Sequence, residues 1–248
     1  MEAAAPPACW KAARNPLDSR SFFFVGRAIS RQPPSRAALL HMIPPFRAYL
    51  FDVDGTLVDS AADICGTIQQ VLHASGRHDV SDALLRRYIG RHLFDLFADL
   101  GFPQASMDPL LIDYRARYTA AGHPNTSVYP GVSEMLQSLG GLKSTATTKG
   151  TPTTRVILEK FSLIKYFNHV QGTDGFPAKP EPDVILKSLE IFNIPPRECL
   201  MVGDAPSDME AGRRAGVKTC AVRYGYGDLE AMAAFTPDFW IDHPSQLV

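Results

Sequence analysis

The chain has 248 residues, of which 45% are hydrophobic and 21% are charged, and its formal net charge at pH 7 is −1. This composition is typical of a folded globular protein, and the length fits one large domain or a medium domain with a smaller insert. Near-neutral charge without long blocks of one sign argues against a nucleic-acid partner, and no apolar run reaches the roughly 18 residues of a membrane helix. The four cysteines lack zinc or disulfide spacing, so we expect reduced thiols and a cytoplasmic location.

The first 41 residues differ from the rest of the chain. They carry several arginines but only two acidic residues, Glu2 and Asp18, and they include a short apolar run, FFFV. This is not the pattern of a secretory signal. An Arg-rich transit-like peptide and a start placed too early are both compatible with it, and Met42 favours the second. We therefore expect residues 1–41 to form a disordered extension outside the fold.

Short apolar runs recur along the rest of the chain, separated by stretches with helical periodicity. Runs of this length that end near Asp, Gly or Thr are typical of buried strands. Alternating strands and helices predict a parallel sheet with crossover helices, so we expect a doubly wound, Rossmann-like α/β fold. The predicted strands are residues 47–53, 143–148, 169–174, 199–204 and 218–223.

Local signals predict where the helices between these strands begin and end. Thr151 before Pro152 is the pattern of an N-cap followed by proline in the first turn. Pro182 and Pro206 are expected to open two further helices, and Gly216 to close the second of them. These helices would carry the chain from one parallel strand to the next.

A gap of roughly ninety residues separates the first two predicted strands, far more than an ordinary connection. After a first stretch of apolar residues at helical spacing, a second helical pattern begins at Ser81 and a third at Asp108. The gap therefore predicts a structured, all-helical insert. We expect this cap to occupy residues 62–127 and the α/β core to comprise residues 42–61 and 128–248.

Polar residues gather where the predicted strands end. In an open parallel sheet these ends lie at one edge, where such folds bind ligands. Several carboxylates at one edge repel one another unless a cation joins them, and oxygen ligands in this number suit Mg²⁺. The sequence therefore predicts a magnesium site. The candidate residues are Asp52, Asp54, Thr147, Thr148, Lys179, Asp204 and Asp208.

Four segments resemble, in order, the four motifs of the haloacid dehalogenase superfamily. They are FDVDGTLVDS (51–60), TATTKG (145–150), AKPEPD (178–183) and VGDAPSDMEAGRRAG (202–216). The helical insert is similar to the cap of the subfamily that includes phosphoglycolate phosphatases, pyrophosphatases and sugar-phosphate phosphatases. VYPGV (128–132) and RYGYGD (223–228) favour the phosphoglycolate phosphatase branch.

The resemblance implies roles for the aspartates. Asp52 is expected to attack phosphorus and form an aspartyl-phosphate, and Asp54 to act as general acid and base. Dehalogenases of the superfamily lack the second aspartate, so Asp54 favours a phosphatase or a mutase. The side chains of Asp52, Asp204 and Asp208, with the backbone carbonyl of Asp54, are expected to bind Mg²⁺.

The resemblance also implies roles for the remaining candidates. Thr147 is expected to donate its hydroxyl to a phosphoryl oxygen, and Lys179 to neutralise charge. The family usually has Asn where this chain has Thr148, which affects a secondary contact. In the cap, Arg91 follows Gly90 and is a candidate for binding a substrate carboxylate; a hinge with a solvated charge is the alternative.

The expected function is Mg²⁺-dependent hydrolysis of a small phosphorylated metabolite, with 2-phosphoglycolate as the leading candidate by resemblance. Pyrophosphatase, sugar-phosphate phosphatase and phosphomutase activities remain open. A phospho-receiver domain uses similar residues, but its acidic pair and phosphoacceptor lie on different strands. A non-catalytic phosphate-binding protein would lack motif residues, and only the Thr148 position is unusual here. Neither nucleic acid nor membrane is expected as a partner, and the sequence gives no oligomeric state.

Overall fold

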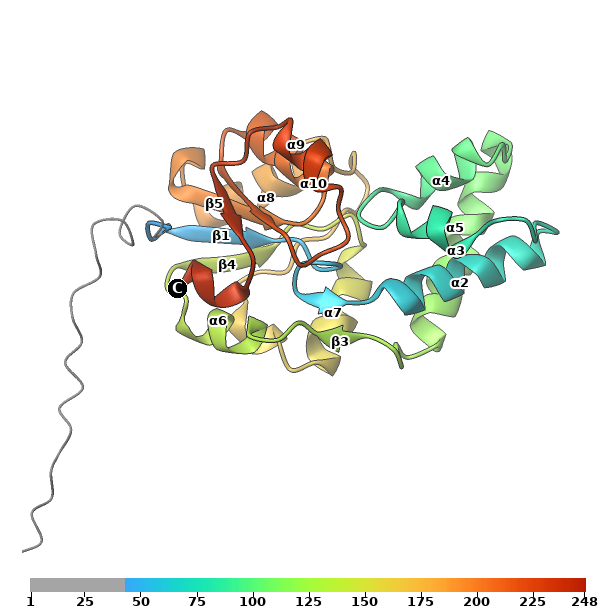
Figure 1. Ribbon diagram of the computed structural model, residues 1–248, viewed down its shortest axis with the longest axis horizontal. Helices are drawn as coiled ribbons and strands as arrows, with labels where there is room; N and C mark the ends of the chain where they lie inside the picture. Colours follow the sequence, from blue (N-terminus) through green and yellow to red (C-terminus); the bar gives the residue numbers. More distant parts are fainter. Residues whose placement is uncertain (1–42) are drawn as a thin grey trace, which may run out of the picture. The chain divides into compact units, whose positions relative to one another are not determined.

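The computed structural model describes residues 43–248 (Figure 1). The predictions made for residues 1–41 lie outside this range. Within it, no helix is both long enough and apolar enough to cross a membrane.

A five-stranded parallel sheet forms the centre of the described structure, with strand order β4-β1-β5-β6-β7. The central strands β1 and β5 are buried at every position, as expected for a parallel sheet covered on both faces. The doubly wound fold predicted from the sequence is therefore confirmed. The strands are β1 (Ala48–Phe51), β4 (Leu142–Thr145), β5 (Cys199–Gly203), β6 (Lys218–Val222) and β7 (Phe239–Ile241).

Helices cover both faces of this sheet (Figure 1). Alternate residues of β1 point to opposite faces: Phe51 joins the hydrophobic cluster that includes Ile157 of α7, and Leu50 joins the cluster that includes Ile185 of α8. Each face of the sheet thus packs against its own layer of helices. The core helices are α6 (Val132–Ser138), α7 (Thr151–Lys160), α8 (Asp183–Phe192), α9 (Pro206–Ala215) and α10 (Leu229–Ala233).

The long segment between the first two strands of the sheet is helical. It starts and ends at a small antiparallel pair, β2 (Val58–Asp59) with β3 (Ser127–Val128), so both connections to the core run side by side. In Figure 1 these helices form a group beyond the carboxyl end of β1. They are α2 (Ala61–Ala74), α3 (Asp82–Arg86), α4 (Leu93–Asp99) and α5 (Met107–Ala120), with the short 3-10 helix η1 (Gln104–Ser106).

Two sequence predictions were wrong in detail. Residues 169–174 do not form a strand: a single bridge joins His169 to Ser144, and then the amide of Gln171 bonds to Oγ1 of Thr145 (2.9 Å) rather than to a backbone partner. Thr151 is the first residue of α7 rather than its N-cap, which is Gly150. The sequence reading also missed β7 and the 3-10 helices η2 (Ile164–Tyr166), η3 (Pro196–Glu198) and η4 (Pro244–Leu247).

Candidate active site

The candidate site begins where β1 ends. The amide of Asp52 donates a hydrogen bond to the carbonyl oxygen of Val202 (2.9 Å), which ties this residue to β5. Gly55 then turns the chain with φ of +85°, a conformation that side chains rarely adopt. A Cβ at Gly55 would lie 2.1 Å from Oδ2 of Asp204. This position therefore requires glycine for space as well as for backbone conformation.

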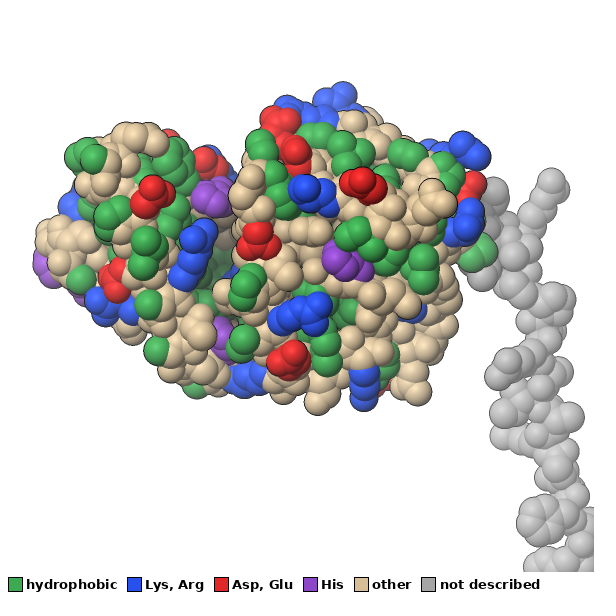
Figure 2. Space-filling model, turned by 180° about the vertical axis from the view of Figure 1, so that it is seen from behind, with side chains coloured by type: hydrophobic (Ala, Val, Ile, Leu, Met, Phe, Trp, Pro, Cys, Tyr) green, Lys and Arg blue, Asp and Glu red, His purple; other side chains and the backbone are tan. Residues whose placement is uncertain are grey.

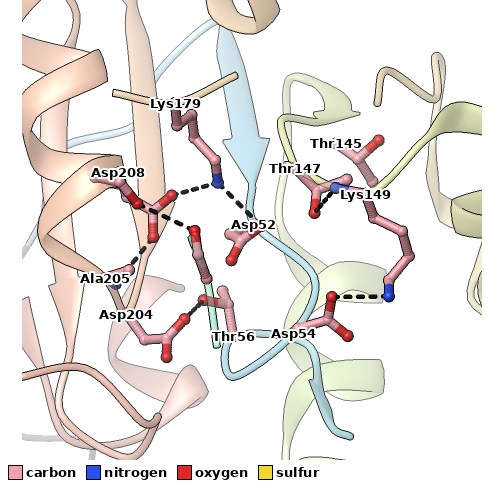
Figure 3. Close-up of polar contacts among 12 residues, drawn as sticks. Asp52, Asp54, Thr56, Thr145, Thr147, Lys149, Lys179, Asp204, Ala205 and Asp208 are labelled. Atoms are coloured by element: carbon pink, nitrogen blue, oxygen red, sulfur yellow. Dashed lines mark hydrogen bonds and ion pairs between the residues drawn. The ribbon is translucent and has the colours of Figure 1, made fainter. Parts of the chain in front are cut away.

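Asp52 lies in a buried cluster with Lys179 and Asp208 (Figure 3). Nζ of Lys179 is 3.0 Å from Oδ1 of Asp52 and also contacts Oδ1 of Asp208, whose Oδ2 accepts a hydrogen bond from the amide of Ala205 (2.9 Å). Burial raises the pKa of Asp52 to about 6, although Lys179 opposes the shift. Burial disfavours the charged form of Lys179 as well, but the two carboxylates outweigh it and raise the pKa of Lys179, which stays protonated.

Asp204 follows β5 and is held by two donors that the sequence did not predict. Its carboxylate accepts hydrogen bonds from Oγ1 of Thr56 (3.0 Å) and from the amide of Tyr226 (2.8 Å). Burial, reinforced by the charges of Asp52 and Asp208, raises the pKa of Asp204 well above its ordinary value. The two donors hold Asp204 in place while the neighbouring charges oppose its ionisation.

The three carboxylates form a set suited to a metal ion. One oxygen from each of Asp52, Asp204 and Asp208 lies within 4.8 Å of the other two. Within residues 43–248, ion pairs join these carboxylates and that of Asp54 to two lysines, Lys179 and Lys149, which leaves a formal charge of −2 when all four carboxyls are ionised. One divalent cation would neutralise this charge, and carboxylate oxygens are the ligands that Mg²⁺ prefers. The donor set therefore fits the predicted magnesium ion.

Asp54 makes a different set of contacts from Asp52. Oδ1 of Asp54 accepts a hydrogen bond from Oγ of Ser60 (2.6 Å), and Oδ2 lies 3.2 Å from Nζ of Lys149 (Figure 3). Burial opposes the charge of Lys149, but Asp54, Tyr114 and Asp52 together raise the pKa of Lys149. Lys149 lies within the segment TATTKG (145–150), but the sequence analysis predicts no role for it. A lysine that follows a phosphate-binding motif was the signal available.

The two threonines after β4 occupy different places. Thr147 is buried at the sheet edge, and its Oγ1 accepts a long hydrogen bond from the amide of Lys149 (3.4 Å). Thr148 is partly exposed and lines a small pocket next to Asp54. Thr147 therefore belongs to the edge at which Asp52 lies, and Thr148 faces the space under the helical insert.

Arg91 lies on the helical insert, away from the buried carboxylates. Its guanidinium stacks on the ring of Tyr88 (4.6 Å to the centroid) and lies 3.8 Å from Asp95 and 3.9 Å from Asp99. The residue before Arg91 contacts the core, because Oγ of Ser207, in the first turn of α9, donates to the carbonyl oxygen of Gly90 (3.3 Å). The structure thus places Arg91 near the site without bringing it into the acidic cluster.

Two spaces separate the insert from the core, and the surface in Figure 2 is hollowed along this boundary. The larger is a cleft of about 670 Å³, lined from the core by Lys179, Pro206 and Tyr226 and from the insert by Arg86, Arg87 and Arg91. The smaller is a pocket of about 80 Å³, which we call the Asp54 pocket; the residues that line it include Asp54, Thr148 and Lys149 from the core and Tyr88, Arg91, Tyr114 and Tyr118 from the insert.

A parallel sheet with an acidic cluster at its carboxyl edge, and with a helical insert after its first strand, defines a Rossmann-like α/β protein with a cap-like insert. Comparison with known proteins gives the family. The chain belongs to the haloacid dehalogenase-like hydrolase family, whose model matches residues 49–222.

Relatives of known name cover most of the chain. A phosphoglycolate phosphatase of Aquifex aeolicus (strain VF5) is 34% identical over 215 residues, which span 82% of this chain and 95% of the relative. A phosphoglycolate phosphatase of Vibrio parahaemolyticus is 33% identical over 80% of this chain and 92% of its own length. A solved structure of a predicted phosphatase from Clostridium acetobutylicum is 28% identical, with a TM-score of 0.77 over 82% of this chain and 97% of that protein. The chain is accordingly a phosphoric monoester hydrolase.

Proposed function

We propose that this phosphatase is Mg²⁺-dependent, that it acts through an aspartyl-phosphate on Asp52, and that its substrate is 2-phosphoglycolate. The observation that carries the mechanism is the division of the site at the end of β1. Asp52 lies in the cluster that fits a cation, and Asp54, two residues later, faces a separate pocket that has room for a leaving group.

In the proposed reaction, Asp54 first takes up a proton from solvent. A carboxylate oxygen of Asp52 attacks phosphorus as the bond from phosphorus to the ester oxygen breaks, and Asp54 gives its proton to that leaving oxygen. A water molecule then attacks the phosphorus of the aspartyl-phosphate, Asp54 takes the water proton, and inorganic phosphate and free Asp52 result. One acid and one nucleophile at a single strand end can thus perform both steps.

Asp52, Asp204 and Asp208, with the backbone carbonyl of Asp54, would hold the magnesium ion. When bound, the ion would offset the repulsion between the carboxylates and the substrate phosphate, which at 4 Å costs roughly 4 kcal/mol for each charge pair at an effective dielectric constant of 20. Lys179, which lies 3.0 Å from Asp52, would neutralise further charge. Thr147 would donate its hydroxyl to a phosphoryl oxygen, with Thr148 as a secondary contact.

The substrate proposal rests on the relatives described above, several of which are phosphoglycolate phosphatases. Pyrophosphate, sugar phosphates and transfer to a second hydroxyl group, as in a mutase, are the alternatives.

Three described cysteines, Cys65, Cys199 and Cys220, are buried free thiols, which supports a reducing location such as the cytoplasm.

We further propose that residues 62–127 act as a cap that opens to admit substrate. Only 1% of Asp52 is exposed, so a phosphate ester cannot reach it in this arrangement. Closure afterwards would exclude water and strengthen the electrostatic contacts with the phosphate.

The test is phosphate release from a panel of esters, with and without Mg²⁺, by the unchanged enzyme and by Asp52→Asn. We expect release from 2-phosphoglycolate that requires Mg²⁺ and that falls by at least about 1000-fold in Asp52→Asn. Asp79→Asn, at an exposed position, is the matched control and is expected to keep full activity. Phosphate release that continues after the metal has been removed by a chelator, or equal phosphate release by Asp52→Asn, would refute the mechanism. Faster phosphate release from another ester would show that 2-phosphoglycolate is not the preferred substrate.

A further inference from the structure

Lys149 is a buried cation to which the proposed reaction assigns no role. Only 10% of its side chain is exposed, and its Nζ lies 3.2 Å from Oδ2 of Asp54 and 4.3 Å from the ring centroid of Tyr118. Enclosure of this kind is costly for a lysine unless its charge meets a partner. In the described structure the partner is Asp54, which is also the proposed proton donor to the leaving oxygen.

The Asp54 pocket is small. A cavity of 150 Å³ holds a benzene molecule, so the 80 Å³ of this pocket leaves room for a group of about three non-hydrogen atoms. Because Asp54 would protonate the leaving oxygen, the carbon chain attached to that oxygen starts beside Asp54. The atoms beyond it then have this pocket to occupy, and a two-carbon chain fits where a sugar ring does not.

The charge and lining of the pocket favour an anion at its end. Lys149 lines it together with Arg91 and Arg115, and its walls include Tyr88, Tyr114 and Tyr118. A charge contact is stronger in such surroundings than on the surface. The hydroxyl of Tyr118 is buried and has no hydrogen-bond partner in the described part of the chain, which leaves an unused polar group in this wall.

We propose that Lys149 is the specificity-determining residue that binds a carboxylate on the leaving group, exchanging its contact with Asp54 for one with the substrate. This inference rests on the proposed function, because it places the leaving oxygen at Asp54. It gives the enzyme a substrate class: phosphate esters of short hydroxy acids. The exchange would also free Asp54 from its ion pair at the moment when the leaving oxygen arrives.

Arg91 is the other cation that the sequence suggested for this task. Arg91 also lines the Asp54 pocket, but its side chain is 47% exposed and it already faces Asp95 and Asp99 on its own part of the insert. Solvent screens an arginine in this position, so its contact with a carboxylate would add little. The comparison of Lys149 with Arg91 therefore provides a matched pair of variants.

The decisive test measures binding rather than turnover. The probes are 3-phosphonopropionate, in which CH₂ replaces the ester oxygen of 2-phosphoglycolate, and 3-hydroxypropylphosphonate, which has the same length without the carboxylate. Both are titrated by calorimetry, with Mg²⁺, into the unchanged enzyme and into Lys149→Met, Lys149→Arg and Arg91→Met. Circular dichroism verifies that each variant is folded.

We expect Lys149→Met to weaken binding of the carboxylate probe by roughly 10- to 100-fold, the effect expected for the loss of one contact between charged groups. Binding of the hydroxyl probe should weaken by less than about threefold. Lys149→Arg should keep most of the preference for the carboxylate probe over the hydroxyl probe, and Arg91→Met should leave that preference unchanged. An equal loss of affinity for both probes in Lys149→Met would overturn the proposal, because Lys149 would then act only through Asp54. If Arg91→Met loses the preference for the carboxylate probe, Arg91 binds the carboxylate and the proposal is also overturned.

Phosphate release from 2-phosphoglycolate and from 2-hydroxyethyl phosphate separates this inference from the proposed function. If neither ester is hydrolysed by the unchanged enzyme while the probes behave as expected, the proposed function fails and Lys149 remains the carboxylate-binding residue. If 2-phosphoglycolate is hydrolysed and Lys149→Met retains the preference for it, the proposed function stands and this inference fails.

Discussion

The buried edge of the sheet and the exposed wall of the helical insert use charge in different ways. At the sheet edge, Lys179 is 3% exposed and contacts both Asp52 and Asp208. On the insert, Arg91 is nearly half exposed and lies almost 4 Å from its acidic neighbours. A buried ion cluster is costly to break, whereas an exposed pair contributes little. Breaking the cluster at the sheet edge should therefore cost much more stability than removing the exposed arginine on the insert.

Removing the buried lysine should give the largest effect. We expect Lys179→Met to destabilise the metal-free protein by about 3 kcal/mol, because it leaves Asp52 and Asp208 buried together without their cation. Chemical denaturation in EDTA measures this change. Lys187→Met, on the exposed side of α8, is the control and should stay within about 0.5 kcal/mol. A similar loss of unfolding free energy in the two variants would contradict the expected difference between buried and exposed charges.

A methyl group at the turn after Asp54 should give the next largest effect. Gly55→Ala combines a φ of +85° with a Cβ placed 2.1 Å from Oδ2 of Asp204, so we expect a loss of about 1–3 kcal/mol together with the loss of Mg²⁺ binding. Gly76→Ala has a similar φ of +77° and an open space around the new Cβ. It should lose about 1 kcal/mol and bind Mg²⁺ normally. Normal Mg²⁺ binding by Gly55→Ala would contradict the described packing.

The stabilisation by Mg²⁺ should depend on pH. Burial raises the pKa of Asp52 from an ordinary 3.8 to about 6 in the metal-free fold, and the pKa of Asp204 also rises. The stability that protonated Asp52 contributes is complete below pH 3.8 and is lost as the pH rises through about 6, and Asp204 acts in the same direction. Mg²⁺ competes with these protons, so the rise in Tm that it causes should be larger at pH 8 than at pH 5 by about 5 °C.

The difference in Tm with and without metal cancels the titration of carboxyls elsewhere in the protein. Asp204→Asn, which removes one of the expected Mg²⁺ ligands, should abolish most of the pH dependence of the rise in Tm that Mg²⁺ causes. A Mg²⁺ effect that is the same at pH 5 and pH 8 would argue that the metal does not bind at this cluster.

Removing the exposed arginine should give the smallest effect. Arg91→Met is expected to change the free energy of unfolding by less than about 0.5 kcal/mol, since its ion pairs are long and solvated. Thermal unfolding of the variant measures this. A loss comparable with that of Lys179→Met would show that the insert depends on its charges as strongly as the core does.

The same contrast explains what the sequence predicted. Asp52 and Asp204 follow apolar runs directly, so the ends of β1 and β5 and the meeting of these carboxylates could be read from local patterns. The contact of Lys149 with Asp54 depends on how the loop after β4 turns toward the insert, and no local pattern reports this. Thr56 and Tyr226 hold Asp204 from distant parts of the chain. Residues 169–174 looked like a strand because their composition is right, but side-chain contacts replace the ladder there.

The most direct test of the central claim is to trap the phosphorylated enzyme. Labelled 2-phosphoglycolate is mixed with the enzyme and Mg²⁺, the reaction is quenched with acid within one turnover, and the peptides are analysed by mass spectrometry. We predict an alkali-labile phosphate on the peptide that contains Asp52, and none on that peptide in Asp52→Asn. Release of phosphate in the first turnover without any labelled Asp52, or a label that persists in Asp52→Asn, would contradict the account.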